Sequence, residues 1–155
     1  MGKELVRGKM IEIRKMEKAD IFQLAEMEKL CFSDPWSLSA FEYELKNPLS
    51  LWLVAAEGSE ILGYVGSQTV LDASDMMNVA VAPAYRRRGI AEKLIVSLIA
   101  MLKQTDSRSL TLEVRCSNTP AVTLYEKLGF SQVGRRPGYY RNPREDALIL
   151  RKEWS

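Results

Sequence analysis

The sequence predicts a mixed α/β domain built on one central sheet. Segments with helical periodicity alternate with segments of strand periodicity, and 155 residues, 46% of them hydrophobic and 27% charged, suit one compact domain. The predicted domain spans residues 10–155. The first nine residues are polar and lack periodicity, so we expect residues 1–9 to form a disordered tail.

The first part of this domain predicts one strand followed by two helices. A short strand is expected at 10–14, and from Ala19 apolar side chains recur at steps of three and four residues, as in an amphipathic helix. Pro35 disfavours helix in the residue before it, so the first helix should end there. Ser37 can cap a second helix, which Asn47-Pro48 ends.

The remainder of the chain alternates strands with helices. The segment Glu57-Gly58-Ser59-Glu60 is typical of a hairpin connection. A helix through 94–102 has an aliphatic face, and a shorter helix has a proline near its start and Gly129 after its end. The expected strands are 51–56, 61–71, 76–82, 109–115, 130–134 and 147–151. The shorter helix is expected at 120–128, and 135–146 is expected to be a loop.

Composition excludes several classes of function. The chain contains no histidine, which removes histidine triads, histidine metal sites and imidazole proton shuttles. Cys31 and Cys116 lie far apart, have no CxxC partner, and are expected to be reduced thiols. The net charge is only +2, and no apolar run approaches the ~20 residues of a membrane span. We therefore expect a cytoplasmic monomer that binds no nucleic acid, no membrane and no metal.

The segment 78–91 predicts a phosphate-binding turn. A strand ends, three arginines follow at 86–88, and Gly89 and Ala91 open a helix whose free amides and dipole suit an anion. Gly89 lets the backbone approach a ligand closely. A solvated charge run before a helix is the alternative, but it gives no reason for the spacing of Gly89 and Ala91.

Three polar residues downstream are candidates for chemistry. Glu113 lies on the face of its strand opposite the aliphatic residues, as either an exposed carboxylate or a general base. Asn118 follows this strand and can cap the next helix, hold a ligand, or do both. Tyr125 is either a core tyrosine with a tethered hydroxyl or the proton donor to a leaving thiolate.

Aromatic residues cluster in two segments that are expected to be loops. Either they form a groove that binds a peptide, or they are buried anchors of the loops. The residues are Phe32, Pro35 and Trp36 in the first segment and Tyr139 and Tyr140 in the second.

Together these segments resemble the GCN5-related N-acetyltransferase family. Its cofactor signature, Arg/Gln-x-x-Gly-x-Gly/Ala after a strand, corresponds to residues 86–91, and residues 112–118 and 121–130 also match. The resemblance runs from Met10 to Trp154. It implies a single mixed, mostly antiparallel twisted sheet flanked by helices on both faces, and acetyl-CoA as the co-substrate.

The resemblance also implies a role for each candidate. Glu113 would accept a proton from the attacking amine, directly or through water, and Tyr125 would protonate the coenzyme A thiolate. A backbone N–H near Val81, where the strand bulges, would stabilise the oxyanion. The implied cofactor-binding positions are Val79, Ala80 and Val81 along the acetyl-pantetheine arm, Arg86, Arg87, Arg88, Gly89, Ile90, Ala91 and Glu92 around the pyrophosphate, and Asn118 near the pantetheine.

Within the family, the chain most resembles bacterial enzymes that acetylate the N-terminal alanine of a small-subunit ribosomal protein. The matching residues are 32–37, 78–81, 112–115, 118, 124–126, 139–140 and 144–147. This similarity implies a protein α-amine as the acceptor. A broader protein or small-amine acetyltransferase is one alternative, because the cofactor signature does not specify the acceptor. A non-catalytic acetyl-CoA sensor is another, although such a sensor would not need both Glu113 and Tyr125.

Overall fold

The computed structural model describes residues 3–6 and 9–155, and its elements alternate as the sequence predicts. The strands are β1 (Lys3–Val6), β2 (Lys9–Lys15), β3 (Ser50–Glu57), β4 (Glu60–Val70), β5 (Ala73–Val81), β6 (Ser109–Arg115), β7 (Ser131–Tyr140) and β8 (Glu145–Glu153). The helices are α1 (Ile21–Cys31), α2 (Leu38–Lys46), α3 (Ile90–Leu102) and α4 (Thr119–Lys127), with short 3₁₀ turns η1 (Lys18–Asp20) and η2 (Pro83–Tyr85).

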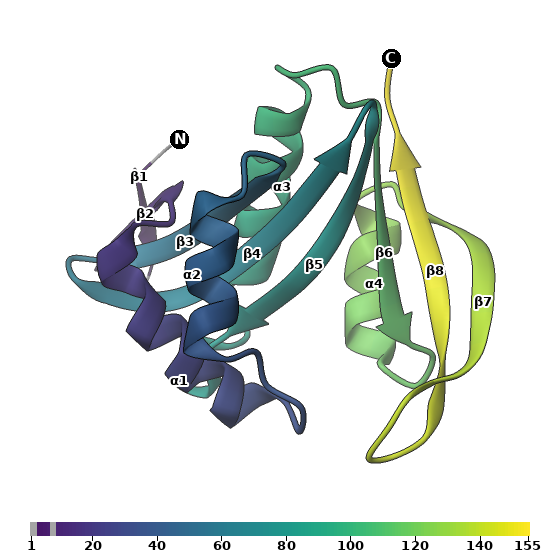
Figure 1. Cartoon of the computed structure of the whole chain (residues 1–155), viewed down its shortest axis with the longest axis horizontal. Helices are drawn as coiled ribbons and strands as arrows, with labels where there is room; N and C mark the ends of the chain where they lie inside the picture. The colour runs from purple at the N-terminus through teal and green to yellow at the C-terminus, as the bar shows by residue number, and fades with distance from the viewer. Residues whose placement is uncertain (1–2, 7–8) are drawn as a thin grey trace.

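Over the described residues, one eight-stranded sheet runs in the order β1-β2-β3-β4-β5-β6-β8-β7. Neighbouring strands are antiparallel except β5 and β6, which run parallel. Figure 1 shows α1 and α2 over one face of the sheet and α3 over the other. The predicted fold class, a mixed and mostly antiparallel sheet with helices on both faces, is therefore confirmed.

Alternation along β3 divides the interior into two cores. Leu53 and Ala55 point toward α3, whereas Trp52 and Val54 point toward α1 and α2. Burial of one such large aliphatic side chain stabilises the fold by roughly 1.5–3 kcal/mol. Gly66 on β4 lies against the Trp52 ring, and a Cβ there would overlap it. The two cores hold the central strands rigidly between the helical layers.

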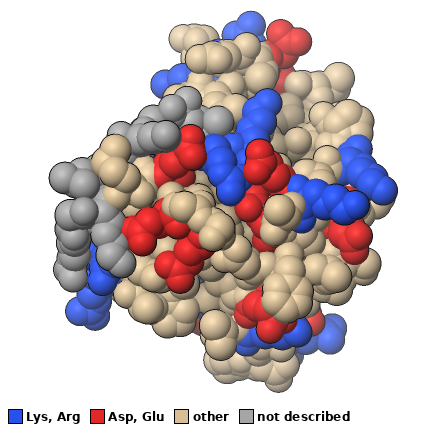
Figure 2. All heavy atoms as spheres, turned by 90° about the vertical axis from the view of Figure 1, so that its left-hand side faces the viewer, with Lys and Arg blue, Asp and Glu red and all other residues tan. Residues whose placement is uncertain are grey.

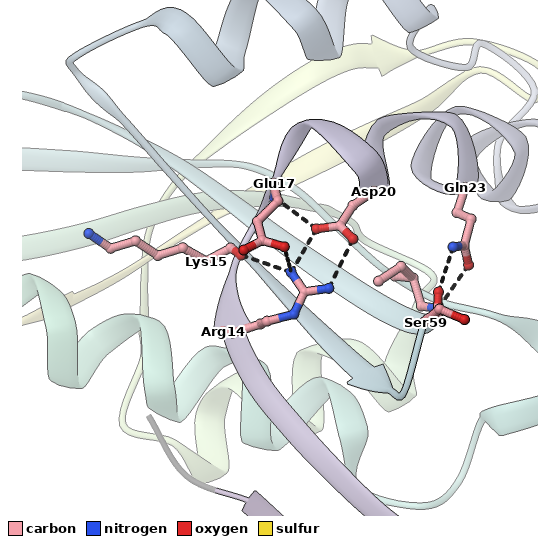
Figure 3. A network of polar contacts seen from close by, with 7 residues as sticks. Arg14, Lys15, Glu17, Asp20, Gln23 and Ser59 are labelled. Atoms are coloured by element: carbon pink, nitrogen blue, oxygen red, sulfur yellow. Dashed lines mark hydrogen bonds and ion pairs between the residues drawn. The ribbon is translucent and has the colours of Figure 1, made fainter.

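A polar network fixes the start of α1 (Figure 3). The Arg14 guanidinium donates to both carboxylate oxygens of Asp20, at 2.8 and 2.9 Å, and the Glu17 N–H donates to the same carboxylate at 2.8 Å. One turn further on, the Gln23 side chain bonds the Ser59 carbonyl in the β3–β4 hairpin at 2.7 Å. α1 is thereby tied to both β2 and the hairpin.

Two segments differ from the sequence-based prediction. Residues 135–146, expected to be a loop, lie largely in β7 and β8. The strand was not predicted there because β7 carries two register shifts, and Gly134, Pro137 and Gly138 obscure its alternation. The expected tail, 1–9, lies partly outside the described residues, but Lys3–Val6 pairs with β2, opposite Lys9–Glu12. The free edge of β2 supplies the backbone groups for this pairing.

None of the helices in the described part of the chain has the length and apolar character needed to cross a bilayer. On the face of the molecule turned toward the viewer in Figure 2, acidic and basic side chains are interspersed. This mixture agrees with the near balance of 22 basic and 20 acidic residues.

Candidate active site

The parallel strands β5 and β6 pair only at one end and then separate. Their register covers Ala73–Asp75 against Ser109–Thr111 and goes no further. Figure 1 shows the two strands meeting at their upper ends and diverging below. We call the place where the two strands diverge, between Met76–Val81 of β5 and Leu112–Arg115 of β6, the split. Most of the candidate residues lie on or beside it.

A bulge in β5 lies at the start of the split. The register between β4 and β5 shifts between Gly66 and Ser67, which face Asn78 and Met76, so Met77 is the extra residue. The expectation that β5 bulges near Val81 is therefore wrong. A bulge increases local strand twist, which is consistent with β5 turning away from β6 at this point.

Backbone groups of β5 point into the split at alternate residues. The Ala82 N–H donates to the Leu62 carbonyl at 2.8 Å, so even-numbered residues of this stretch bond to β4. Val79 and Val81 consequently direct their N–H and C=O groups away from β4, whereas Ala80 faces β4. Of the predicted pantetheine-lining residues, only Val79 and Val81 thus offer backbone groups to the split.

Two of those groups already have partners within the chain. The Val79 N–H donates to the side-chain oxygen of Asn78 at 3.0 Å. The Val81 carbonyl accepts from Arg86 Nε at 3.1 Å, and Arg86 Nη2 also lies 3.4 Å from Cys31 Sγ. Arg86 therefore fastens the arginine turn to the end of β5 rather than pointing out of it.

The turn before α3 has the form expected of an anion cradle. Arg87 and Gly89 have positive φ values of 63° and 73°, and no side chain caps the helix at Gly89. A Cβ added at Gly89 would meet nothing within 4 Å, so open space lies beside the first amides of α3. Free amides, a positive helix end and exposed Arg87 fit a pyrophosphate. Arg88 lies over the Tyr85 ring, 5.3 Å from its centroid.

The remaining residues assigned to the cofactor have structural partners. Ile90 is buried in the core against the sheet, and Ala91 is half-buried. Glu92 forms an ion pair with Lys127 at 2.7 Å, which joins the start of α3 to the end of α4. Asn118 caps α4 by accepting the Ala121 N–H at 3.3 Å. Its capping role is thus observed, and its ligand role stays a prediction.

Glu113 has a buried oxygen without a partner. Its Oε2 is inaccessible to solvent and accepts no hydrogen bond from the described residues, and Arg136 Nε lies 3.8 Å away. The neighbouring Glu113 carboxylate favours the protonated phenol and so raises the pKa of Tyr139. Burial raises the pKa of Asp75, and the nearby Glu113 carboxylate adds to that increase. A buried acceptor without a hydrogen bond is costly, which distinguishes this carboxylate from an ordinary exposed one.

Tyr125 is a core tyrosine whose hydroxyl reaches the split. Its ring packs edge-on against Phe130, with centroids 5.6 Å apart, and its hydroxyl lies 4.0 Å from Met76 Sδ. Burial, with a smaller contribution from Tyr140, raises its pKa well above that of a free phenol. The two interpretations of Tyr125 are therefore compatible, because the ring packs and the hydroxyl remains protonated.

The aromatic residues of the α1–α2 loop do not behave alike. Trp36 packs against Phe41 and Trp52 at centroid distances of 5.6 and 5.4 Å, which makes it a packing anchor. Phe32 and Pro35 remain exposed. A peptide-binding surface on this loop would therefore use Phe32 and Pro35 rather than the face of Trp36.

The second aromatic pair lies on β7, not in a loop. The Tyr139 and Tyr140 rings are 5.0 Å apart, with Tyr139 next to Glu113 and Tyr140 under the Arg115 guanidinium at 4.5 Å. Burial, reinforced by Glu113, raises the pKa of Tyr140 to about 12. Across the described residues, no hydrogen bond, ion pair or ring contact joins this pair to the Phe32–Trp36 loop.

Sequence reasoning missed one buried group beside the site, Glu28. It is fully buried, and its carboxylate accepts from the Trp36 N–H, the Tyr64 hydroxyl and the Asn78 amide. The signal was present: Glu28 falls four residues after Leu24, on the apolar stripe of α1. An acid at such a position indicates a buried polar network.

Comparison with known proteins agrees with this geometry. Residues 21–130 match the model of the Acetyltransferase (GNAT) family. The chain therefore belongs to the GNAT acetyltransferases, whose co-substrate is acetyl-CoA.

Individual relatives narrow the comparison. The chain is 37% identical to the ribosomal protein bS18-alanine N-acetyltransferase of Haemophilus influenzae over 142 residues, covering 89% of this chain and 95% of the relative. The crystal structure of the corresponding Escherichia coli enzyme has a TM-score of 0.87 at 32% identity, covering 94% of this chain and 95% of that one. Arabidopsis thaliana NAA60 in complex with acetyl-CoA shares the fold, with a TM-score of 0.84 at 21% identity, covering 92% of this chain and 98% of that one.

Proposed function

We propose that this chain transfers the acetyl group of acetyl-CoA to the N-terminal α-amine of a protein, with the alanine of ribosomal protein bS18 as the acceptor. The relatives named for that reaction match almost the whole chain. The observation that carries the proposal is the buried Oε2 of Glu113 beside the split, which accepts no hydrogen bond from the described residues and has Arg136 Nε 3.8 Å away. A site that only bound acetyl-CoA would not need it.

The backbone and the arginine turn fit acetyl-CoA. The α3 amides and Arg87 would hold the pyrophosphate, and the free groups of Val79 and Val81 would hold the extended arm in the split. When bound there, acetyl-CoA supplies an acetyl thioester. The split is thus the path along which the acetyl group would reach Glu113 and Tyr125.

The reaction then needs a base, an oxyanion donor and an acid. The Glu113 carboxylate accepts, through water, the proton that the α-ammonium must lose before its nitrogen attacks. The Val81 N–H donates to the oxygen that gains charge, and one such donor contributes about 3 kcal/mol. Tyr125 gives its phenolic proton to the sulfur as the C–S bond breaks and the C–N bond remains. The nitrogen loses a second proton as the tetrahedral intermediate collapses to the amide. Of the two protons that the nitrogen has lost, one returns through solvent to Tyr125 and the other is released, so the ammonium and the thioester give the amide, the thiol and one proton.

Two peptides test the acceptor. One carries the N-terminal sequence of bS18 beginning with alanine, and the other has the same sequence with its α-amine blocked and an internal lysine free. Release of coenzyme A on the first peptide alone supports the proposal. Turnover on the second indicates a broader amine acetyltransferase, and binding of acetyl-CoA without turnover on either peptide indicates a sensor.

A further inference from the structure

The buried carboxylate of Glu28 joins four elements around the split. Oε1 accepts the Trp36 N–H at 2.9 Å, and Oε2 accepts both the Tyr64 hydroxyl and, at 2.5 Å, the Asn78 amide. These partners lie in the α1–α2 loop, β4 and β5, and Glu28 itself lies on α1. Its relative exposure is 0%. All three donors are neutral, so none of them compensates the negative charge of the carboxylate.

Burial of a carboxylate stabilises a core less than burial of an apolar side chain, because the charge loses its hydration. Burial raises the pKa of Glu28, against the hydrogen bonds from Trp36, Tyr64 and Asn78, which lower it. Apolar residues of the same volume would fill the space at lower cost. A polar network at this position instead defines the orientation of its partners, because each donor is directional.

Two of the oriented partners belong to the proposed site. The Trp36 N–H fixes the loop that exposes Phe32 and Pro35, the proposed contacts for the acceptor peptide. Asn78, held through its amide nitrogen by Glu28, accepts the Val79 N–H with its oxygen at 3.0 Å. Asn78 also lies beside the bulge at Met77 where the split begins. One carboxylate therefore fixes the positions of both the α1–α2 loop and the part of β5 that would face the acetyl arm.

We propose that Glu28 is a positioning residue. It holds the α1–α2 loop, the proposed contact of the acceptor peptide, in a fixed position relative to β5, so that the α-amine lies next to the acetyl group. This inference rests on the proposed function. Glu28 touches neither reactant, and its effect passes through Trp36 and Asn78. Small errors of position between two reactants cost large factors in rate, so a loosened network should slow acetyl transfer more than it weakens cofactor binding.

The test compares Glu28→Gln with a matched control. Glutamine keeps the shape, but its NH₂ group cannot accept from Tyr64 and Asn78. We expect kcat/KM for the bS18 peptide to fall about tenfold or more, with the Kd of acetyl-CoA within about threefold of wild type. Glu44→Gln is the control, because Glu44 is also buried and accepts from Ser50 and Trp52, at 2.8 and 3.1 Å, away from β5 and the loop backbone.

A second variant separates positioning from stability. In Glu28→Gln/Asn78→Asp the amide and the carboxylate exchange places, so an N–H···O bond between the two positions is restored in the opposite direction. We expect this double variant to recover several-fold of the lost kcat/KM. Should Glu28→Gln fail to fold, Asn78→Ser is the substitute, because of the hydrogen bonds to Glu28 it removes only the one from β5. We expect Asn78→Ser to lower kcat as well.

Amide hydrogen exchange gives a readout that does not depend on the acceptor. Exchange at Trp36 and Val79 should accelerate in Glu28→Gln and not in Glu44→Gln. If wild type does not acetylate the peptide, the proposed function fails, while the exchange result still decides whether Glu28 couples the loop to β5. Wild-type kinetics and exchange in Glu28→Gln, or losses equal to those of Glu44→Gln, would overturn the positioning role.

Discussion

The hydroxyl of Tyr125, on α4, lies 4.0 Å from the sulfur of Met76, on β5. A buried phenol normally finds a strong acceptor, yet a thioether sulfur is a weak one. The contact places a protonated hydroxyl at the split with most of its hydrogen-bonding capacity unused. This is the arrangement required of a group that must give a proton to a leaving sulfur.

Replacement of Tyr125 by phenylalanine removes the proposed proton donor and keeps the ring. Tyr125→Phe should lower kcat by about 10²-fold, as expected for loss of a general acid, and leave the KM of acetyl-CoA nearly unchanged. Tyr85→Phe is the control, because that hydroxyl bonds Glu60 at 2.7 Å outside the split. Steady-state kinetics measure both variants, and an equal effect in the two would remove Tyr125 from the mechanism.

The raised pKa of Tyr125 has a consequence for the pH profile. Burial favours the neutral phenol, so the proton stays on Tyr125 beyond the ordinary phenol pKa of about 10. Loss of activity between about pH 8 and 10 therefore should not come from Tyr125. A pH–kcat profile of wild type with an alkaline limb in that range, absent from Tyr125→Phe, would contradict this.

The arginine turn should act on the cofactor alone. Arg87→Ala and Arg88→Ala should each raise the apparent KM for acetyl-CoA several-fold. Tm should stay within about 2 °C in Arg87→Ala, because an exposed charge contributes little to stability, and should fall slightly more in Arg88→Ala, which also loses the contact with the Tyr85 ring. The increase should shrink at high salt, as the attraction to the pyrophosphate is screened. Unchanged cofactor kinetics in both variants would show that these arginines form a solvated charge run and do not bind the cofactor.

The two aromatic residues of the α1–α2 loop should separate stability from acceptor binding. Trp36→Ala removes a ring packed on Phe41 and Trp52 and should cost about 3 kcal/mol of unfolding free energy. Phe32→Ala removes a side chain that is 36% exposed, so it should lower the unfolding free energy less than Trp36→Ala does, while the KM of the peptide rises. Urea denaturation and peptide kinetics on both variants distinguish them, and the reverse pattern would place Trp36 in the acceptor site.

Acid should weaken the anchor at the start of α1. Burial opposes ionisation of Asp20, but the hydrogen bonds from Arg14 and the Glu17 N–H outweigh it and lower the pKa of Asp20. A carboxyl whose folded pKa is depressed stabilises the fold above its ordinary pKa of about 4, and that contribution is lost as the pH falls below it. Asp20→Asn should therefore be less stable than wild type at neutral pH, and the difference should narrow in acid. Urea denaturation across this pH range measures it, and a constant difference would contradict the linkage.

The sequence predicted most of this fold because the periodic elements are strongly patterned. Alternation over Ser109–Arg115 placed Glu113 opposite the aliphatic face, and the structure keeps those bounds. The strands β7 and β8 were predicted too short, with a loop at 135–146, because register shifts and the residues Gly134, Pro137 and Gly138 break the alternation there. Periodicity reports which face is buried, and it fails where a strand is bulged and exposed on both faces.

Only part of the candidate site could be predicted, because the rest depends on strand register and tertiary contacts. Motif spacing located the arginine turn and Asn118, but no spacing rule shows that Arg86 turns back to Val81 or that Ala80 faces β4. Those facts depend on the register of β4 and β5 and on the bulge at Met77. Glu28 could have been noticed as an acid on an apolar stripe, whereas its partners are remote in sequence and only the tertiary fold brings them together.

The central claim is that Glu113 acts on the acceptor amine and not on the cofactor. The most direct measurement compares acetyl-CoA affinity, by calorimetry, with turnover of the alanine peptide for wild type and Glu113→Gln. The account predicts an unchanged Kd for acetyl-CoA and a kcat at least about 10²-fold lower. Equal loss of affinity and turnover, or loss of neither, would contradict it.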